Sequence, residues 1–183
     1  PTEPKTWTEI DNMTEFFRAY DKSHVLTMMA QEAIDFQDYY RCYVLGREHV
    51  RVMRYDPKAP FDRRYVRDAE PTEPKLLARI ERDALTLCKE LGYDFNTVEF
   101  AVREGIPIAI DFMNPAPDCD KFSVGEDNFA WVMAKSADFL IDRVFEENWT
   151  KLVIVEGPYD ALKLYAAGVP AVAILGTGNW TAV

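Results

Sequence analysis

The sequence predicts an α/β protein built from two parts. Residues 1–147 are expected to form an antiparallel sheet with helices on one face, and residues 148–183 a parallel βαβ segment. Three observations support this prediction. Two pairs of alternating runs are typical of β-hairpins, apolar residues recur at helical spacing between them, and a continuous apolar run near the C-terminus is typical of a buried parallel strand.

The two expected hairpins supply the antiparallel sheet. In the first, residues 39–45 and 49–55 alternate in polarity on either side of a short glycine-containing segment. In the second, residues 97–103 and 106–112 flank Glu104-Gly105. Alternation with a period of two places successive side chains on opposite faces of a strand, so each hairpin would bury one face.

Residues 74–91 carry the clearest helical pattern, because their apolar residues recur every three to four positions. Glu73 precedes this segment, where an acid suits a helix N-terminus, and Gly92 follows it as a C-terminal stop. Other patterns predict further elements, in chain order: a helix over residues 13–20 capped by Asn12 or Thr14, a strand over 25–31, and a helix over 128–145.

The last part of the chain has a different pattern. Residues 152–155 and 171–175 are continuous apolar runs, and residues 159–167 between them have helical spacing. Glycine-containing turns separate the three segments. This order predicts two parallel strands joined by a helix.

Composition and apolar patterning restrict the class of protein. The chain has 183 residues and is 48% hydrophobic, which suits a globular core. No apolar run approaches the ~20 residues that span a membrane, and no secretory signal is visible. The three cysteines lack metal-type spacing, so we expect free thiols in a reducing cytoplasm.

Charge is unevenly distributed along the chain. The net charge of −10 argues against broad binding to nucleic acid. Residues 41–67 contain eight basic and three acidic residues, a balance of +5 that leaves −15 for the rest. This basic island indicates either a local site for an anion such as polyphosphate or a solvated strand face.

Two carboxylates and an amide lie on the second expected hairpin: Glu99, Asp111 and Asn114. Hard oxygen ligands of this kind suit Mg²⁺ that carries phosphates. A purely structural interpretation also fits, with Glu99 facing solvent on a strand and the other two residues starting a turn before Pro115.

Four segments, in order, resemble the C-terminal part of an ATP-grasp domain over residues 13–143. They are residues 28–34, 38–44, 98–100 and 111–115. In that family they correspond to a hinge beside adenine, a strand with a phosphate-contacting arginine, and two elements with metal ligands. The resemblance implies the ATP-grasp fold and Mg²⁺- and ATP-dependent ligation of a carboxylate to an amine or thiol.

By this resemblance, specific residues take specific roles. Arg41 would contact the transferring phosphate, with Arg51 and Arg54 as further candidates on the same hairpin. The expected Mg²⁺ ligands are Glu99, Asp111 and Asn114, and the residues expected to line the nucleotide site are Gln31, Glu32 and Ile34.

The sequence departs from the family pattern in two ways. The family's metal element has one residue between the acid and the asparagine, whereas Asp111 and Asn114 are separated by two. Either a bulge redirects Asp111 or Asp111 is not the ligand. The family's lysine and glycine-rich phosphate loop have no counterpart before residue 13, so we expect weak ATP affinity from this chain alone.

Residues 151–180 resemble the opening βαβ unit of a Toprim domain, the metal-binding module of primases and topoisomerases. The resemblance rests on residues 155–162, 167–173 and 175–178. It implies an acid–base or metal-side role for Glu156. The family's Asp-x-Asp pair has no counterpart before Val183. A βαβ unit that serves only structure explains the same residues.

Three functional interpretations follow. The first is an Mg²⁺- and ATP-dependent ligase by descent, incomplete in this chain, acting on a small-molecule carboxylate. The second is a Toprim-type nucleic-acid enzyme fragment, and the third is a folded, non-catalytic fusion. A partner or a second copy would supply the parts that either enzyme lacks. Membrane association is not expected.

Overall fold

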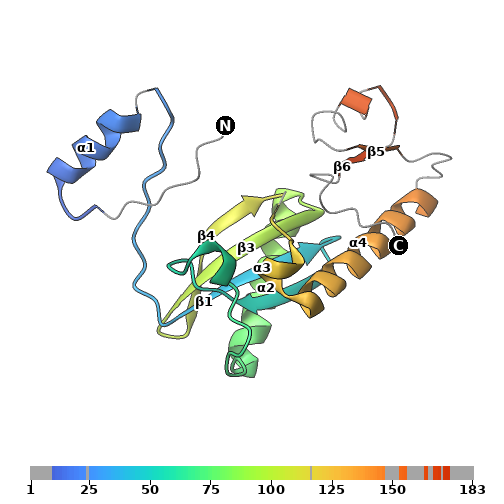
Figure 1. Cartoon of the computed structure of the whole chain (residues 1–183), viewed down its shortest axis with the longest axis horizontal. Helices are drawn as coiled ribbons and strands as arrows, with labels where there is room; N and C mark the ends of the chain where they lie inside the picture. Colours follow the sequence, from blue (N-terminus) through green and yellow to red (C-terminus); the bar gives the residue numbers. More distant parts are fainter. Residues whose placement is uncertain are drawn as a thin grey trace. The chain divides into compact units, whose positions relative to one another are not determined.

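The computed structural model describes residues 10–23, 25–115 and 117–146 and, further on, 153–155, 163–164, 167–169 and 171–173. The chain divides into two compact units, residues 1–35 and 36–183. Figure 1 shows the helices and strands, coloured in sequence order. The domain boundary predicted after residue 147 lies inside the second unit and stays a prediction.

The second unit is built on a four-stranded antiparallel sheet with the order β2-β1-β3-β4. Its strands are β1 (Asp38–Leu45), β2 (His49–Arg54), β3 (Phe95–Arg103) and β4 (Ile106–Asn114). Both predicted hairpins are therefore confirmed. Glu104 and Gly105 have φ values of 54° and 72°, as a two-residue turn between twisted strands requires.

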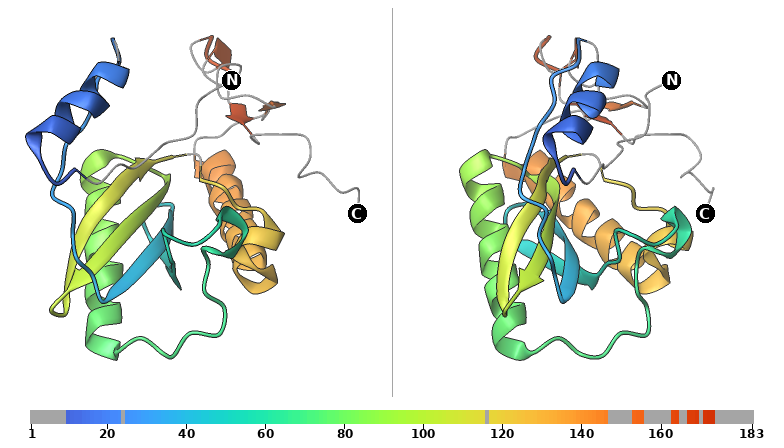
Figure 2. Two further views of the ribbon diagram at one scale, coloured as in Figure 1. Left: turned by 60° about the vertical axis from the view of Figure 1, so that its left-hand side comes forward. Right: turned by 90° about the vertical axis from the view of Figure 1, so that its left-hand side faces the viewer.

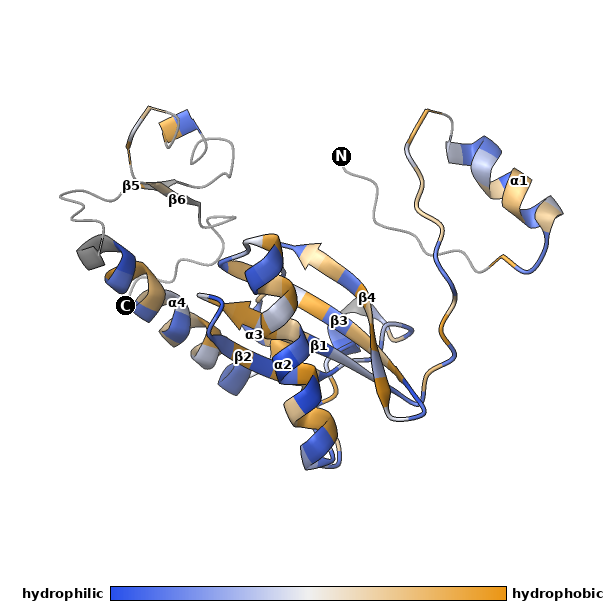
Figure 3. Ribbon diagram, turned by 180° about the vertical axis from the view of Figure 1, so that it is seen from behind, coloured by the Kyte–Doolittle hydropathy of each residue, from blue (hydrophilic) through white to orange (hydrophobic). Residues whose placement is uncertain are grey.

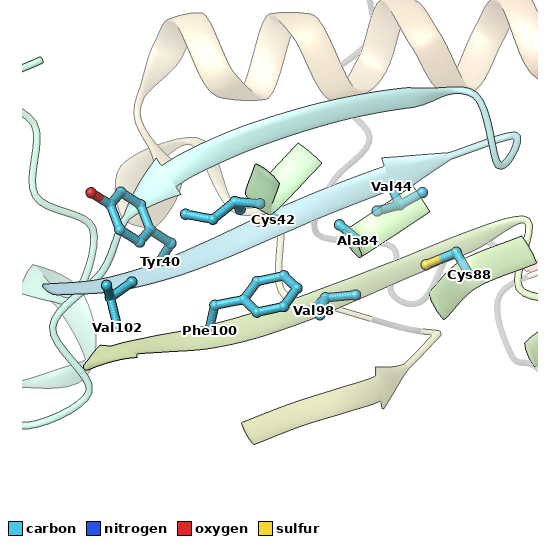
Figure 4. Packing of buried hydrophobic residues seen from close by; sticks show 9 residues of the cluster. Tyr40, Cys42, Val44, Ala84, Cys88, Val98, Phe100 and Val102 are labelled. Atoms are coloured by element: carbon cyan, nitrogen blue, oxygen red, sulfur yellow. The ribbon is translucent and has the colours of Figure 1, made fainter. Parts of the chain in front are cut away.

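Helix α2 (Pro74–Leu91) covers one face of this sheet and forms the main core with it (Figure 2). Figure 3 shows hydrophobic and hydrophilic residues mixed along α2, as the amphipathic pattern predicts. The buried core cluster takes its members from β1, α2 and β3 (Figure 4): Tyr40, Cys42, Val44, Ile80, Ala84, Cys88, Val98, Phe100 and Val102.

The ends of α2 lie where the sequence predicts them. A Glu73 carboxylate oxygen accepts a hydrogen bond from the Leu76 N–H at 2.8 Å, which satisfies one of the free donors at the helix N-terminus. Gly92 ends the helix in the left-handed conformation, with φ of 77°.

Helix α4 (Glu126–Glu146) packs against β1 and the β1–β2 turn. It confirms the helix predicted over residues 128–145. A methyl group at Gly46, in that turn, would lie 3.1 Å from the Phe139 ring of α4.

Two shorter elements, η1 (Phe61–Arg63) and α3 (Lys121–Val124), contact each other. No helix formed by the described residues is long and apolar enough to cross a membrane.

The first unit contains one helix, α1 (Met13–Ser23), which begins where the side chain of Asn12 accepts a hydrogen bond from the Glu15 N–H at 3.1 Å. The strand predicted over residues 25–31 is wrong, because residue 25 lies in a turn and residues 26–31 belong to no helix or strand. Val25 and Met29 are 97% and 78% exposed. An apolar run becomes a strand only when it finds a partner strand.

The C-terminal part contains β5 (Val153–Val155) and β6 (Ala171–Ala173), which pair in parallel. This pairing confirms the parallel strands of the predicted βαβ segment. Of the helix expected between them, the structure describes residues 163–164, which are helical. Glu156 lies outside the described residues.

Candidate functional site

The face of the sheet opposite α2 carries a row of charged side chains. Arg41 on β1 pairs directly with Glu99 on β3, and Glu99 pairs with Asp111 on β4. Directly opposed residues on antiparallel strands point to the same face, so these three side chains lie side by side. In the next row, Thr97 pairs with Asn114. This surface is called the site face, and it comprises Tyr39, Arg41, Thr97, Glu99, Asp111 and Asn114.

Strand β4 has one irregularity on each side of Asp111. Between the Thr97–Asn114 and Glu99–Asp111 pairs, β3 advances by two residues and β4 by three, and the register shifts again between Glu99 and Phe100. Each shift places one extra residue in β4, which is a β-bulge. The two residues between Asp111 and Asn114 are thus accommodated, and Asp111 shares a face with Glu99.

Glu99 is almost buried, with 13% of its side chain exposed, and two neighbours contact its carboxylate. The Tyr39 hydroxyl donates to Oε2 at 2.7 Å, and the Arg41 Nη1 atom lies 3.6 Å from Oε1. Burial raises the pKa of Glu99 above its usual range, although Arg41 and Tyr39 oppose this shift. Asp111 adds to the rise, because a second carboxylate nearby disfavours the charge.

Arg41 lies in an aromatic enclosure. Its guanidinium carbon is 5.3 Å from the ring centre of Tyr55 and 5.9 Å from that of Tyr65, and Nη1 donates to the Tyr55 hydroxyl at 3.2 Å. Burial works against its charge, but the neighbouring phenols and Glu99 outweigh burial, and the pKa of Arg41 is raised. Its Nε atom is buried and has no hydrogen-bond partner among the described residues.

The tyrosines around Arg41 were not predicted as site residues. Tyr39 and Tyr43 are two positions from Arg41 on the same strand, so a period of two would have placed them on its face. Tyr55 and Tyr65 meet through an isolated β-bridge that no local pattern signals. Burial raises the pKa of Tyr65 to about 12, so its phenol stays neutral beside Arg41 at physiological pH.

The donor set of the site face fits Mg²⁺. No group of three or more His, Cys, Asp or Glu side chains in the described part of the chain is arranged to hold a metal. The ligand set that the resemblance implies combines the carboxylates of Glu99 and Asp111 with the amide of Asn114. All three donors are hard oxygens. The contacts with Tyr39 and Arg41 leave lone pairs on the Glu99 carboxylate, which has about four acceptor positions.

A hollow of about 620 Å³ lies beside the site face at Tyr39. Its other lining residues include Phe36, Asp38, Tyr55 and Glu70. Aromatic rings together with a few charged groups are typical of small-molecule sites. Tyr39 links this space to the carboxylate row, because it lines the hollow and also donates to Glu99. Arg54 lines the hollow as well.

The two further arginine candidates have other contacts. Arg51 Nε donates to the Asn128 side chain of α4 at 2.8 Å. Arg54 pairs with Tyr40, on the face that α2 covers, and forms an ion pair with Asp38. The structure therefore does not bring Arg54 to the face that carries Arg41.

The predicted nucleotide-lining residues Gln31, Glu32 and Ile34 belong to the first unit, where they lie outside helices and strands. Gln31 and Glu32 are exposed and Ile34 is partly buried. Their roles, like those of Arg51 and Arg54, stay predictions. The Toprim role of Glu156 also stays a prediction, since that residue lies outside the described ranges.

Comparison with known proteins by sequence finds no match. No protein-family model matches the chain, and no curated protein matches it.

Comparison with solved structures finds similarity to D-alanine–D-alanine ligase from Bacillus anthracis. The crystal structure of that enzyme complexed with ATP is 16% identical in sequence, with a TM-score of 0.57 over 75% of this chain and 49% of that chain. A second crystal structure of the enzyme gives 16% identity and a TM-score of 0.56, over 76% of this chain and 51% of that one.

The similarity extends over most of this chain but about half of the ligase. At this level of identity it bears on the fold alone. The predicted α/β fold with an antiparallel sheet is confirmed, and it is similar to the fold of this ligase.

Proposed function

We propose that the site face binds Mg²⁺ and the phosphates of ATP, and that the chain acts in ATP-dependent ligation of a carboxylate to an amine or thiol. One observation carries the proposal. Arg41, Glu99 and Asp111 occupy one row across three neighbouring strands, on a sheet with the fold of an ATP-dependent ligase. A cation and two carboxylates in one row suit a metal beside a phosphate.

The residues of the row take complementary roles in this proposal. Glu99, Asp111 and Asn114 would hold Mg²⁺, and the bound ion would supply positive charge to neutralise the phosphates. In the reaction class, the γ-phosphoryl group of ATP passes to the substrate carboxylate, and the nucleophile then displaces phosphate. Arg41 stabilises the charge on the transferring group.

Two features of Arg41 support an anion-binding role. Its unpaired buried Nε leaves a donor without a hydrogen bond from the described residues, and a buried donor gains free energy when an acceptor reaches it. Its guanidinium stays charged at every physiological pH. The hollow beside Tyr39 offers space for the carboxylate substrate or for part of the nucleotide.

The chain spans about half the length of the ligase structures that it matches. We therefore assign only Mg²⁺ and phosphate binding to this chain.

Titration calorimetry with ATP, with and without Mg²⁺, tests the proposal. We expect weak binding that requires Mg²⁺ and is lost in Glu99→Gln, because the amide that replaces the carboxylate carries no charge for the metal. Glu104→Gln is the matched control, since Glu104 lies in the turn between β3 and β4 and is exposed. Its binding should equal that of the wild type.

The alternatives predict different results. Binding that is independent of Mg²⁺, or equal in wild type and Glu99→Gln, would overturn the ligase proposal. DNA binding that weakens as salt increases would favour the Toprim-type interpretation. Absence of both kinds of binding would favour a non-catalytic protein.

A further inference from the structure

Asn96 is a fully buried amide near the start of β3. It is 0% exposed and pairs with Val44, so it belongs to the face of the sheet that α2 covers. A buried amide is costly unless hydrogen bonds satisfy it. The hydrogen-bond partners of the Asn96 side chain therefore indicate its structural role.

The Asn96 side chain joins two backbone groups of β4. Its Nδ2 donates to the Phe112 carbonyl at 2.8 Å, and its Oδ1 accepts from the Asn114 N–H at 2.8 Å. These two groups lie on either side of Met113, within the bulge between Asp111 and Asn114. One side chain thus replaces ladder hydrogen bonds that the bulge interrupts.

This arrangement requires a group that donates and accepts at once. The Phe112 carbonyl only accepts and the Asn114 N–H only donates, which sets the orientation of the Asn96 amide. An ionised aspartate would lack the donor and leucine would lack both groups. The amide also contacts α2, because Nδ2 lies 3.4 Å from the Cys88 sulfur.

We propose that Asn96 is the positioning residue of the metal site, because it holds the β4 bulge that sets the spacing of Asp111 and Asn114. This inference rests on the proposed function for the identity of the ligands. Asn96 does not touch the metal itself. It acts through the backbone of β4, as residues behind a metal ligand commonly orient that ligand.

Binding of Mn²⁺ in the presence of ATP to the full chain tests this role. Mn²⁺ prefers the same oxygen ligands as Mg²⁺ and is observed directly by electron paramagnetic resonance. We expect Asn96→Leu, which keeps the branching at Cγ and the number of side-chain heavy atoms but removes both bonds, to weaken Mn²⁺ binding by about 10- to 100-fold. Cys88→Ala is the matched control, because it changes the same buried contact and leaves both β4 bonds in place.

The control separates positioning from stability. Both variants should lower the melting temperature, since both remove buried contacts, but only Asn96→Leu should lose metal affinity. Equal Mn²⁺ affinity in Asn96→Leu and wild type would overturn the positioning role. Failure of the wild type to bind Mn²⁺ through Glu99, judged by Glu99→Gln, would instead overturn the proposed function and the ligand assignment with it.

A measurement on the wild type keeps the inference testable if Asn96→Leu does not fold. The Asn114 N–H should be protected from hydrogen exchange, because a buried side chain accepts its hydrogen. Exchange of this amide at the rate of an unfolded chain would show that Asn96 does not hold the bulge. This result depends on no ligand, so it is independent of the proposed function.

Discussion

Glu99 is a carboxylate whose surroundings act on its charge in opposite directions. Burial and the nearby Asp111 disfavour ionisation, whereas Arg41 and the Tyr39 hydroxyl favour it. Burial is the larger influence, and the pKa is raised. A buried carboxylate with a raised pKa beside a cation is typical of functional sites. The raised pKa can be tested by the pH dependence of stability.

The first prediction concerns the stability of the wild type relative to Glu99→Gln. Because the folded pKa lies above the unfolded value of about 4.3, the folded state binds more protons at residue 99 between these two values. The free energy of unfolding of the wild type minus that of Glu99→Gln should therefore be largest below about pH 4.3. This difference should decrease as pH rises through the folded pKa. Urea unfolding of both proteins at a series of pH values measures it.

If the free energy of unfolding of the wild type, relative to that of Glu99→Gln, increased with pH over the same range, this prediction would be contradicted. Such an increase would mean that the ion pair with Arg41 outweighs burial and lowers the pKa of Glu99. Glu104→Gln, at an exposed position in the β3–β4 turn, serves as the control for general effects of removing one carboxylate.

The second prediction concerns Tyr39→Phe. The change removes the 2.7 Å hydrogen bond to Glu99 and keeps the buried ring. We expect a loss of about 1 to 2 kcal/mol in the free energy of unfolding, because the acceptor is a charged group that would lose its partner. Tyr20→Phe, at a position 55% exposed in α1, should have no effect in the same urea titration. An equal effect of both variants would contradict the role of the bond.

At the scale of elements, the two hairpin turns differ in one informative respect. Gly46 and Gly105 both have positive φ, at 62° and 72°. A methyl group at Gly105 would meet nothing within 4 Å, whereas one at Gly46 would press on the Phe139 ring of α4. The β1–β2 turn therefore also forms a packing contact with α4.

The third prediction compares Gly46→Ala with Gly105→Ala. We expect Gly105→Ala to lower the free energy of unfolding by about 1 to 2 kcal/mol, the cost of left-handed backbone for a residue with a Cβ. Gly46→Ala should cost more, because Phe139 must also move. Chemical denaturation measures both. Adding Phe139→Leu to each variant should reduce the difference between them, and an unchanged difference would exclude Phe139 as its cause.

The bulges of β4 are the element-scale feature that decides the candidate site. The sequence indicated one extra residue between Asp111 and Asn114 and left open whether Asp111 is a ligand. Pairing with β3 resolves the placement: Asp111 lies opposite Glu99 and Asn114 opposite Thr97. Because a shift of one residue moves a side chain to the other face of a sheet, only the register could establish this.

At the scale of the whole molecule, the buried core cluster belongs to β1, α2 and β3 within the second unit. The fourth prediction follows from this division. A protein that begins at Phe36 should retain the cooperative thermal unfolding of the full chain, because the residues of its core are all present. Calorimetry of the two proteins tests this. A large drop in melting temperature would show that residues 1–35 contribute to the stability of the second unit.

Local interactions account for what the sequence determined by itself. Apolar spacing and the end residues Glu73 and Gly92 specified α2 to its terminal residues, and alternation with turn residues specified both hairpins. Neighbours in the sequence control these features. The strand expected over residues 25–31 failed because pairing needs a partner that no local pattern supplies.

Tertiary structure alone decided the surroundings of the candidate site. Tyr55 and Tyr65 enclose Arg41 through a bridge between distant residues, and Asn96 contacts β4 across a bulge. Strand register, burial and hydrogen bonds between separate strands arise only when the chain packs. The sequence therefore determined which carboxylates and arginine to consider, and the packed sheet determined which of them lie together.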